Sequence, residues 1–222
     1  MSVLNKKGLE DRLKMPITNP KNIVITPLMR PTEAFDNDSV DLRLGTYFLM
    51  PQIPPDPFLD PTDVYSAKRS HLRVHKPLGS YLVIPAHQTV LGATLEFIKL
   101  PADLSGQILT KSSVARTFLV IETAPWIHPL YRGCLTLEIA NVSNTPLLLY
   151  PGFPIGQLIL MELGGAADDS QPLTSSYVGP IEPEAPVLNH PEIVLSGIGV
   201  NQYKNPHKAH WQPTKPDTVG GE

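Results

Sequence analysis

The chain has 222 residues, of which 41% are hydrophobic and 18% charged, a composition typical of a folded globular protein and not of a disordered one. A formal net charge of -3 without a basic stripe argues against a nucleic-acid-binding protein. No apolar run approaches the roughly 20 residues that span a bilayer.

Cysteine usage and the N-terminal sequence indicate the compartment. Cys134 is the one cysteine, so no internal disulfide can form, which favours a reducing environment. The first 15 residues carry Lys6, Lys7, Arg12 and Lys14 but no apolar stretch, so they do not form a signal peptide. We therefore expect a cytoplasmic protein that neither enters a membrane nor binds nucleic acid.

In chain order, the sequence predicts one helical turn near residues 8–15 and then a series of short strands. The strands are expected at 41–48 with a bend at Gly45, and at 81–84, 90–99, 106–110, 134–141, 147–150 and 155–163. At 90–99 the residues Leu91, Ala93, Leu95 and Phe97 alternate with Thr94 and Glu96, the pattern of a half-buried strand.

Many short strands, with 25 prolines and frequent turn signals between them, predict an all-β fold with short helices, of the distorted β-barrel or jelly-roll kind. We divide the chain into an N-terminal segment (1–38), a β domain (39–163) and an irregular C-terminal arm (164–222). The arm is rich in Pro, Gly, Ser and His and shows little periodicity.

The segment Lys111-Ser112-Ser113-Val114-Ala115-Arg116 is the first candidate for chemistry. Ser112 and Arg116 are four residues apart, so a helical turn places them on one face. Free backbone N–H groups at the start of the turn, with the Ser112 and Ser113 hydroxyls and Lys111, can cradle a phosphate. The alternative is a serine helix cap followed by a surface arginine.

Glu138 is the second candidate, because it interrupts an otherwise apolar strand. It shares a face with the small residues Cys134, Thr136 and Ala140, which indicates a pocket in place of a packed core. Burial raises the pKa of a carboxyl group and suits it to proton transfer. The alternatives are an exposed glutamate on an edge strand and a buried structural ion pair.

The third candidate is the segment from Ala124 to Gly133, which leads directly into the Glu138 strand. Its aromatic residues Trp126 and Tyr131 can frame a planar base or a sugar. A hairpin loop with hydrophobic anchors is the alternative.

In this order and spacing, these segments resemble the dCTP deaminase family, which shares its trimeric fold with dUTPases. The matching segments are Ser112 to Arg116, Tyr131 to Gly133, Thr136 to Glu138 and Pro151 to Leu158, together with Ser39 to Gly45 and Leu91 to Glu96 upstream. The resemblance covers roughly residues 39–163, and dUTPases share part of this set.

The resemblance implies a hydrolase that converts dCTP to dUTP and ammonia without zinc. Glu138 would activate the water, while Ser112 and Arg116 hold the water and the ring and stabilise the developing charge. A lone cysteine also excludes the Cys-x-x-Cys ligands of zinc deaminases. The implied substrate-binding residues are Lys111, Ser113, Ala124, Trp126, His128, Tyr131, Gln157 and Tyr177.

The resemblance also implies Mg²⁺ held mainly through the substrate phosphates, without a protein ligand set, and a homotrimer with sites between subunits. Two alternative functions stay open: a dUTPase or bifunctional enzyme that yields dUMP, and an inactive nucleotide-binding trimer of the same fold.

The chain departs from the family pattern at three places. His128 stands where the family has an aspartate near the sugar, and Lys111 stands where arginine is usual. The C-terminal segment that closes on the phosphates is echoed faintly by Tyr177-Val178-Gly179-Pro180. Between Arg132 and Lys204 there is no lysine or arginine, so Lys204 and Lys208 are candidates for the missing cation.

Overall fold

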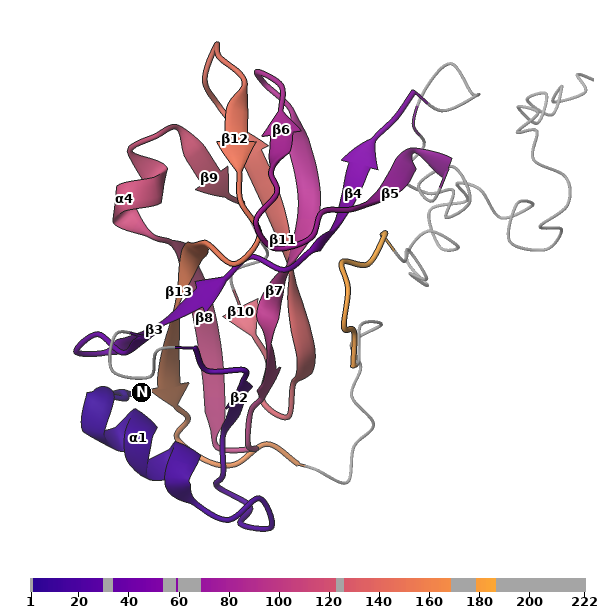
Figure 1. The fold of residues 1–222 in the computed structure, drawn as a ribbon. Helices are drawn as coiled ribbons and strands as arrows, with labels where there is room; N and C mark the ends of the chain where they lie inside the picture. Colours follow the sequence, from indigo (N-terminus) through magenta and orange to yellow (C-terminus); the bar gives the residue numbers. More distant parts are fainter. Residues whose placement is uncertain are drawn as a thin grey trace, which may run out of the picture. The chain divides into compact units, whose positions relative to one another are not determined.

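The computed structural model describes residues 2–29, 34–53, 59, 69–122, 126–168 and 179–186 (Figure 1). All helices and strands named below belong to one compact unit, which comprises residues 1–52 and 71–185. No helix among the described residues is long and apolar enough to cross a membrane.

The described residues of this unit form two larger antiparallel sheets and a separate pair of strands. The first sheet has the order β1 (Ser2–Val3), β13 (Pro154–Glu162), β8 (Leu104–Thr110) and β10 (Trp126–Ile127), and β3 (Ser39–Arg43) also pairs with β13. The second has the order β5 (His71–His75), β4 (Tyr47–Pro51), β7 (Thr89–Lys99), β11 (Arg132–Asn141) and β9 (Leu119–Ile121), and β2 (Val24–Thr26) also pairs with β7.

The separate pair is β6 (Leu82–Ile84) with β12 (Leu147–Leu149), and the helices are α1 (Lys6–Lys14) and α4 (Ser112–Ala115). The predicted all-β fold with short helices is therefore confirmed, although the described strands do not close into a barrel.

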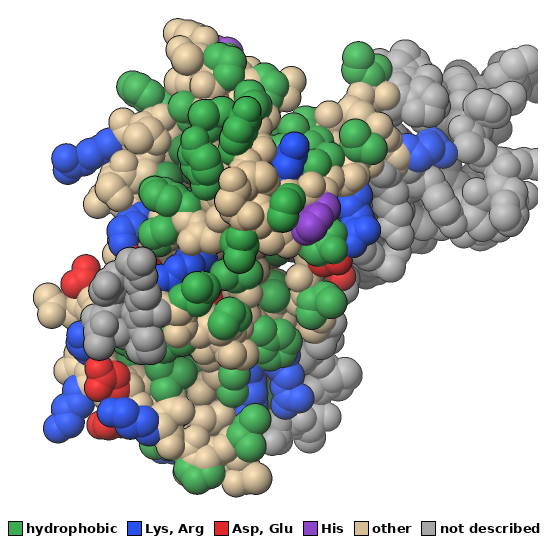
Figure 2. Space-filling model, in the orientation of Figure 1, with side chains coloured by type: hydrophobic (Ala, Val, Ile, Leu, Met, Phe, Trp, Pro, Cys, Tyr) green, Lys and Arg blue, Asp and Glu red, His purple; other side chains and the backbone are tan. Residues whose placement is uncertain are grey.

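Exposed apolar side chains gather over β6 and β12 at the top of Figure 2; they are Tyr81, Val83, Leu148 and Tyr150.

The hydrophobic core draws its side chains from both larger sheets, as expected when two sheets pack face to face. The first sheet contributes Leu42, Ile108, Leu158 and Leu160, and the second contributes Val90, Ile98, Leu137 and Ile139.

The N-terminal residues also pack against this core. Asn5 caps α1 by accepting a hydrogen bond from the amide of Gly8 (2.9 Å), and Leu9 of the same helix is fully buried. From the next turn, Arg12 bonds to Asp103 (2.8 Å).

Both polar members of the alternation along β7 are buried, whereas Leu91, Leu95 and Phe97 are partly exposed. Thr94 is 2% exposed and Glu96 is 0% exposed, and they lie on the face of β7 that contributes Val90 and Ile98 to the core. Their burial is tolerated because both have partners. The Thr94 hydroxyl accepts from the amide of Leu135 (2.9 Å), at the point where the register of β7 and β11 shifts, and Glu96 accepts from the amide of Arg43 (2.8 Å).

The opposite side of this sheet is called the outer face below. Cross-strand pairing brings Phe97 beside Cys134, Ala93 beside Thr136 and Leu91 beside Glu138. The outer face is thus defined by Leu91, Ala93, Leu95 and Phe97 of β7 and by Cys134, Thr136, Glu138 and Ala140 of β11.

Residues 179–185, called the strap below, pass from the start of β11 toward β5. The amide of Gly179 donates to the carbonyl of Arg132 (2.8 Å), and the amide of Cys134 donates to the carbonyl of Pro180 (2.7 Å). Further along, Glu182 accepts hydrogen bonds of 2.6–2.9 Å from Arg73 of β5. The strap therefore joins two strands that lie on opposite sides of β7 in the sheet order.

Gly133 is required where the strap meets β11. Its φ of +145° is a conformation that other residues rarely adopt, and a Cβ there would lie 2.5 Å from Cδ of Pro180. We expect Gly133→Ala to destabilise the protein by about 1–3 kcal/mol, because backbone strain adds to the clash. Thermal denaturation measures this loss. Gly165→Ala is the matched control, because open space surrounds Gly165; equal midpoints for the two variants would contradict this account of Gly133.

Candidate active site

Glu138 is half-buried on the outer face, in the middle of the second sheet. Its neighbours are Leu91 across the strand pair and the side chains of Thr136 and Ala140 on the same strand. Atom Oε2 of Glu138 is buried and has no hydrogen-bond partner among the described residues. Burial raises the pKa of this carboxyl group, and the charge of Glu122 adds to that effect.

The structure distinguishes between the interpretations of Glu138. At Glu138, β11 pairs with β7 on one side. On the other side, the amide of Glu122 donates to the Glu138 carbonyl (2.8 Å). Glu138 is therefore not on an edge strand. No cation of the described residues pairs with it, in contrast to Glu96, which lies 3.5 Å from Nη1 of Arg43. Glu138 is therefore neither an exposed edge-strand residue nor a member of an ion pair among the described residues.

The α4 segment forms the helical turn that the sequence predicts. The amide of Arg116 donates to the carbonyl of Ser112 (3.2 Å), which places these residues one turn apart, and Val114 anchors the turn in the core. Ser112, Ser113 and Arg116 are exposed. They are therefore accessible to a ligand or to another chain.

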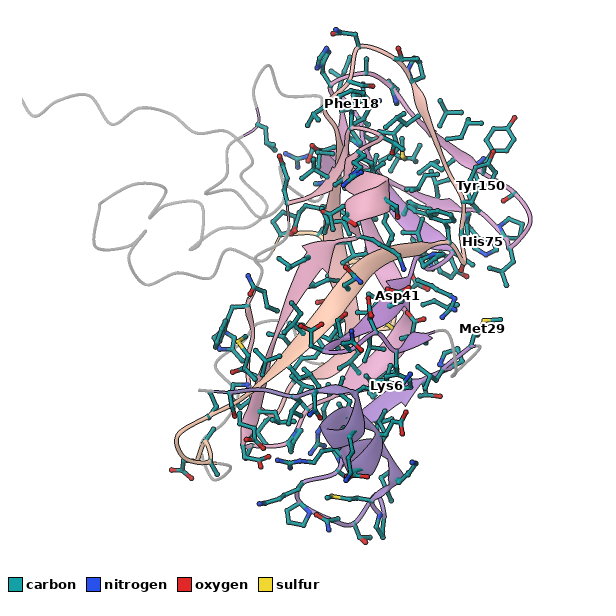
Figure 3. All side chains as sticks on the ribbon, turned by 90° about the vertical axis from the view of Figure 1, so that its left-hand side faces the viewer. Lys6, Met29, Asp41, His75, Phe118 and Tyr150 are labelled. Carbon is teal, nitrogen blue, oxygen red and sulfur yellow. The ribbon has the colours of Figure 1, made fainter. Side chains whose placement is uncertain are left out.

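Lys111 is fixed at the start of α4 by both its backbone and its side chain. Its amide donates to the carbonyl of Ile155 on β13 (3.0 Å), and its ammonium group pairs with the Asp41 carboxylate of β3. Asp41 stands opposite Gln157 in the pairing of β3 with β13, so the three side chains share one site. Figure 3 shows Asp41 on β3, above α1.

The segment that leads into β11 presents an aromatic side chain and a histidine. Trp126 is 41% exposed and pairs with Gln107 of β8, and His128 is exposed. Tyr131 packs against the core and donates its hydroxyl to the carbonyl of Cys134 (2.8 Å). Burial raises the pKa of Tyr131, and the charges of Cys134 and Glu184 contribute. The predicted site residues Ala124 and Tyr177 lie outside the described residues.

The predicted site residues of one chain form separate groups. Lys111 and Gln157 lie with Asp41 near the start of β13, whereas Glu138 lies on the outer face of the other sheet. No hydrogen bond joins α4 to Glu138 in the described part of the chain. In Figure 1, β9 lies between α4 and β11, the strand that carries Glu138. The sequence-based set did not include Asp41, although a carboxylate between Val40 and Leu42 in a strand was a usable signal.

Comparison with known proteins identifies the family. The sequence profile of dCTP deaminase-like domains matches residues 5–163. The chain belongs to this family. Deamination of dCTP is therefore supported at the level of the dCTP deaminase-like family, and so is a nucleotide as the substrate.

Two relatives and one solved structure are similar to this dCTP deaminase-like chain. A dUMP-forming dCTP deaminase of Rhodococcus opacus (strain B4) is 39% identical over 144 residues, which cover 64% of this chain and 73% of the relative. A dUMP-forming dCTP deaminase of Dictyoglomus thermophilum is 32% identical over 147 residues, which cover 66% of this chain and 75% of the relative. The crystal structure of 2'-deoxycytidine 5'-triphosphate deaminase from Agrobacterium tumefaciens has a TM-score of 0.53 at 20% identity, covering 71% of this chain and 47% of its own, and so has the same fold.

The raised pKa of Glu138 predicts how the stability of the dCTP deaminase-like fold depends on pH. A carboxyl group whose pKa is higher in the folded than in the unfolded state opposes folding once it ionises, so its unfavourable contribution appears as pH rises above the usual value of 4.5. We expect Glu138→Gln to raise the midpoint of thermal unfolding near neutral pH. The gain should fade as pH falls toward the unfolded-state value.

The control for the unfolding experiment is a variant that removes a negative charge at another position. Glu10→Gln is suitable, because Glu10 lies on α1 and pairs with Lys14 (3.4 Å). A lower midpoint for Glu138→Gln at every pH would show that the Glu138 carboxylate stabilises the fold.

Proposed function

We propose that the chain deaminates dCTP to dUTP and ammonia, with Glu138 as the group that activates water. The observation that carries this proposal is a half-buried carboxylate with a raised pKa and an unpartnered oxygen on an apolar sheet face. A base of this kind takes a proton from water as the oxygen attacks C4 of cytosine. The tetrahedral intermediate then expels the amino group as ammonia. Of the two water protons, one leaves on the ammonia and the other ends on N3 of the ring as the C4 carbonyl forms, so dCTP and water give dUTP and ammonia without zinc.

Ser112 and Arg116 complete the catalytic set in this proposal. A hydroxyl and a guanidinium on one helical face can hold the water and stabilise the charge that develops on the ring. Both are exposed and make no hydrogen bond to Glu138 within the described part of the chain, which supports a site shared between chains. We accordingly propose a cytoplasmic homotrimer whose α4 turn meets the outer face of a neighbouring subunit.

The remaining residues divide between the two ends of the nucleotide. Lys111, Ser113 and Gln157 are assigned to the phosphates, and Trp126, His128 and Tyr131 to the base and sugar. Ala124 and Tyr177 also belong to the proposed substrate-binding set. The described residues contain no group of three or more His, Cys, Asp or Glu side chains that can hold a metal ion. We propose that Mg²⁺ is carried by the phosphate oxygens of the substrate, where it neutralises their charge.

Removing the Glu138 carboxylate tests the assignment directly. We expect Glu138→Gln to reduce ammonia release from dCTP by about 10²–10⁴-fold, the usual contribution of a positioned proton-transfer group, while nucleotide binding persists. Ammonia release with Mg²⁺ present and calorimetric binding measure the two effects. Glu10→Gln should behave as the wild type. A loss of about twofold in Glu138→Gln would refute the assignment.

A mixing experiment tests whether sites are shared between chains. Arg116→Ala and Glu138→Gln are each expected to be inactive, but their co-expression should produce some sites with both intact residues. Random assortment in a ring of three subunits restores about a quarter of wild-type turnover. If each site lies within one chain, the mixture stays as inactive as its parents, and sedimentation then shows whether a trimer forms at all.

A second candidate function is a bifunctional enzyme that also releases pyrophosphate and yields dUMP. The relatives from Rhodococcus opacus and Dictyoglomus thermophilum bear the name of dUMP-forming enzymes. Exposed His128 lacks the carboxylate expected at its position, which favours simple deamination. Incubation with dCTP and with dUTP, with separate assays for ammonia and pyrophosphate, distinguishes the two; binding without either product indicates an inactive nucleotide-binding protein.

A further inference from the structure

The strap brings a second carboxylate to the outer face. The amide of Glu184 donates to the hydroxyl of Thr136 (3.3 Å), and Thr136 precedes Glu138 by two residues on the same side of β11. Atom Oε2 of Glu184 is buried and has no hydrogen-bond partner among the described residues. Its charge is among the causes, after burial and the charge of Cys134, that raise the pKa of Tyr131.

The lack of partners separates Glu138 and Glu184 from the other buried acids. Among the described side chains, the carboxylate oxygens that are buried without a hydrogen bond belong to these two residues. By contrast, buried Glu96 accepts a hydrogen bond from Arg43, and the partly exposed Glu182, two residues before Glu184, accepts three from Arg73. Burying an acceptor without a donor is unfavourable, so each of these oxygens calls for a donor that the described residues do not supply.

Contacts of the residues just before Glu184, together with its own amide, hold it in this position. Pro180 is fixed against β11 by the amide of Cys134 (2.7 Å), and Glu182 is fixed to β5 by Arg73, whose guanidinium also lies over the ring of Tyr47 at 4.5 Å. Figure 1 shows this part of the strap beside β7 and β11, below β4 and β5. Glu184 thus belongs to a segment that is anchored at several points.

We propose that Glu184 is a second substrate-binding carboxylate, which accepts a hydrogen bond from a neutral donor of the nucleotide. This inference rests on the proposed function. A carboxylate repels phosphates, so Glu184 faces the base and sugar end of the ligand, which lies on the side of Glu138 and Tyr131. The neutral donors at that end are the sugar hydroxyl and the amino group of cytosine.

Three nucleotides distinguish these donors. Calorimetric binding is measured in the Glu138→Gln background, which prevents turnover, with and without Glu184→Ala. We expect Glu184→Ala to weaken dCTP binding about tenfold or more, as for a hydrogen bond to a charged group. If the sugar hydroxyl is the donor, the loss disappears with 2',3'-dideoxy-CTP; if the amino group is the donor, it disappears with dUTP. An equal loss with all three nucleotides, or a loss below about twofold with dCTP, overturns the proposal.

The midpoint of thermal unfolding without nucleotide distinguishes a ligand-binding role of Glu184 from a structural one, because Glu184→Ala lowers this midpoint only if Glu184 stabilises the fold. Because Glu184 Oε2 has no partner in the described part of the chain, Glu184→Ala should leave the midpoint unchanged or raise it, while the increase produced by dCTP becomes smaller. A lower midpoint without nucleotide would mean that Glu184 stabilises the fold and would refute a ligand role.

A control variant and the binding of the Glu138→Gln protein show whether a negative result counts against Glu184 or against the proposed function. Glu10→Ala removes a carboxylate from the exposed surface of α1 and should leave all three affinities unchanged. If the Glu138→Gln protein binds none of the three nucleotides, the proposed function fails, and the role of Glu184 fails with it. If it binds them and Glu184→Ala changes nothing, the proposed function stands and the inference about Glu184 is wrong.

Discussion

The pairing of β7 with β11 is the interaction on which the rest of the site depends. Its register places Glu138 beside Leu91 and Thr136 beside Ala93, and it directs Leu137 and Ile139 into the core. Because side chains alternate between the two faces of a strand, a slip of one residue would move Glu138 into the core. The shift of register near Leu135 is accommodated by the Thr94 hydroxyl, which accepts the Leu135 amide.

Buried carboxylates in this protein fall into two kinds. Glu96 lies between the sheets and accepts a hydrogen bond from the backbone amide of Arg43, so this bond helps to join β3 to β7. Glu138 and Glu184 lie on the outer face with oxygens that no described residue binds. A satisfied carboxylate contributes to structure, whereas an unsatisfied one raises the free energy of the empty protein. Binding of a ligand that supplies donors removes this unfavourable contribution.

The division of the candidate groups within one chain has a consequence for assembly. The pair of Lys111 and Asp41 fixes the start of α4 on the first sheet, while the strap and β11 fix Glu138 and Glu184 on the second. The proposed shared site would combine the exposed turn of one copy, with its serine and arginine, and the outer face of another, with its carboxylate. Contact between copies of the chain would bring them together.

Features that depend on residues close in sequence could be predicted from the sequence by itself. The spacing of Ser112 and Arg116 predicted the α4 turn, and the alternation along residues 134–141 predicted that Glu138 shares a face with Thr136. The same motifs identified the dCTP deaminase-like family, because they carry its pattern in order. Helical and strand periodicities act over a few residues, so these patterns are visible without tertiary contacts.

Other features were decided by the tertiary structure, because they arise from residues far apart in the chain. Thr94 and Glu96 are buried, which their polarity did not indicate, because Leu135 and Arg43 provide their partners. The pairing of Lys111 with Asp41 and the contact of Glu184 with Thr136 join segments separated by dozens of residues. No local pattern encodes such contacts, since the free energy of burying a polar group depends on which partner the fold places beside it.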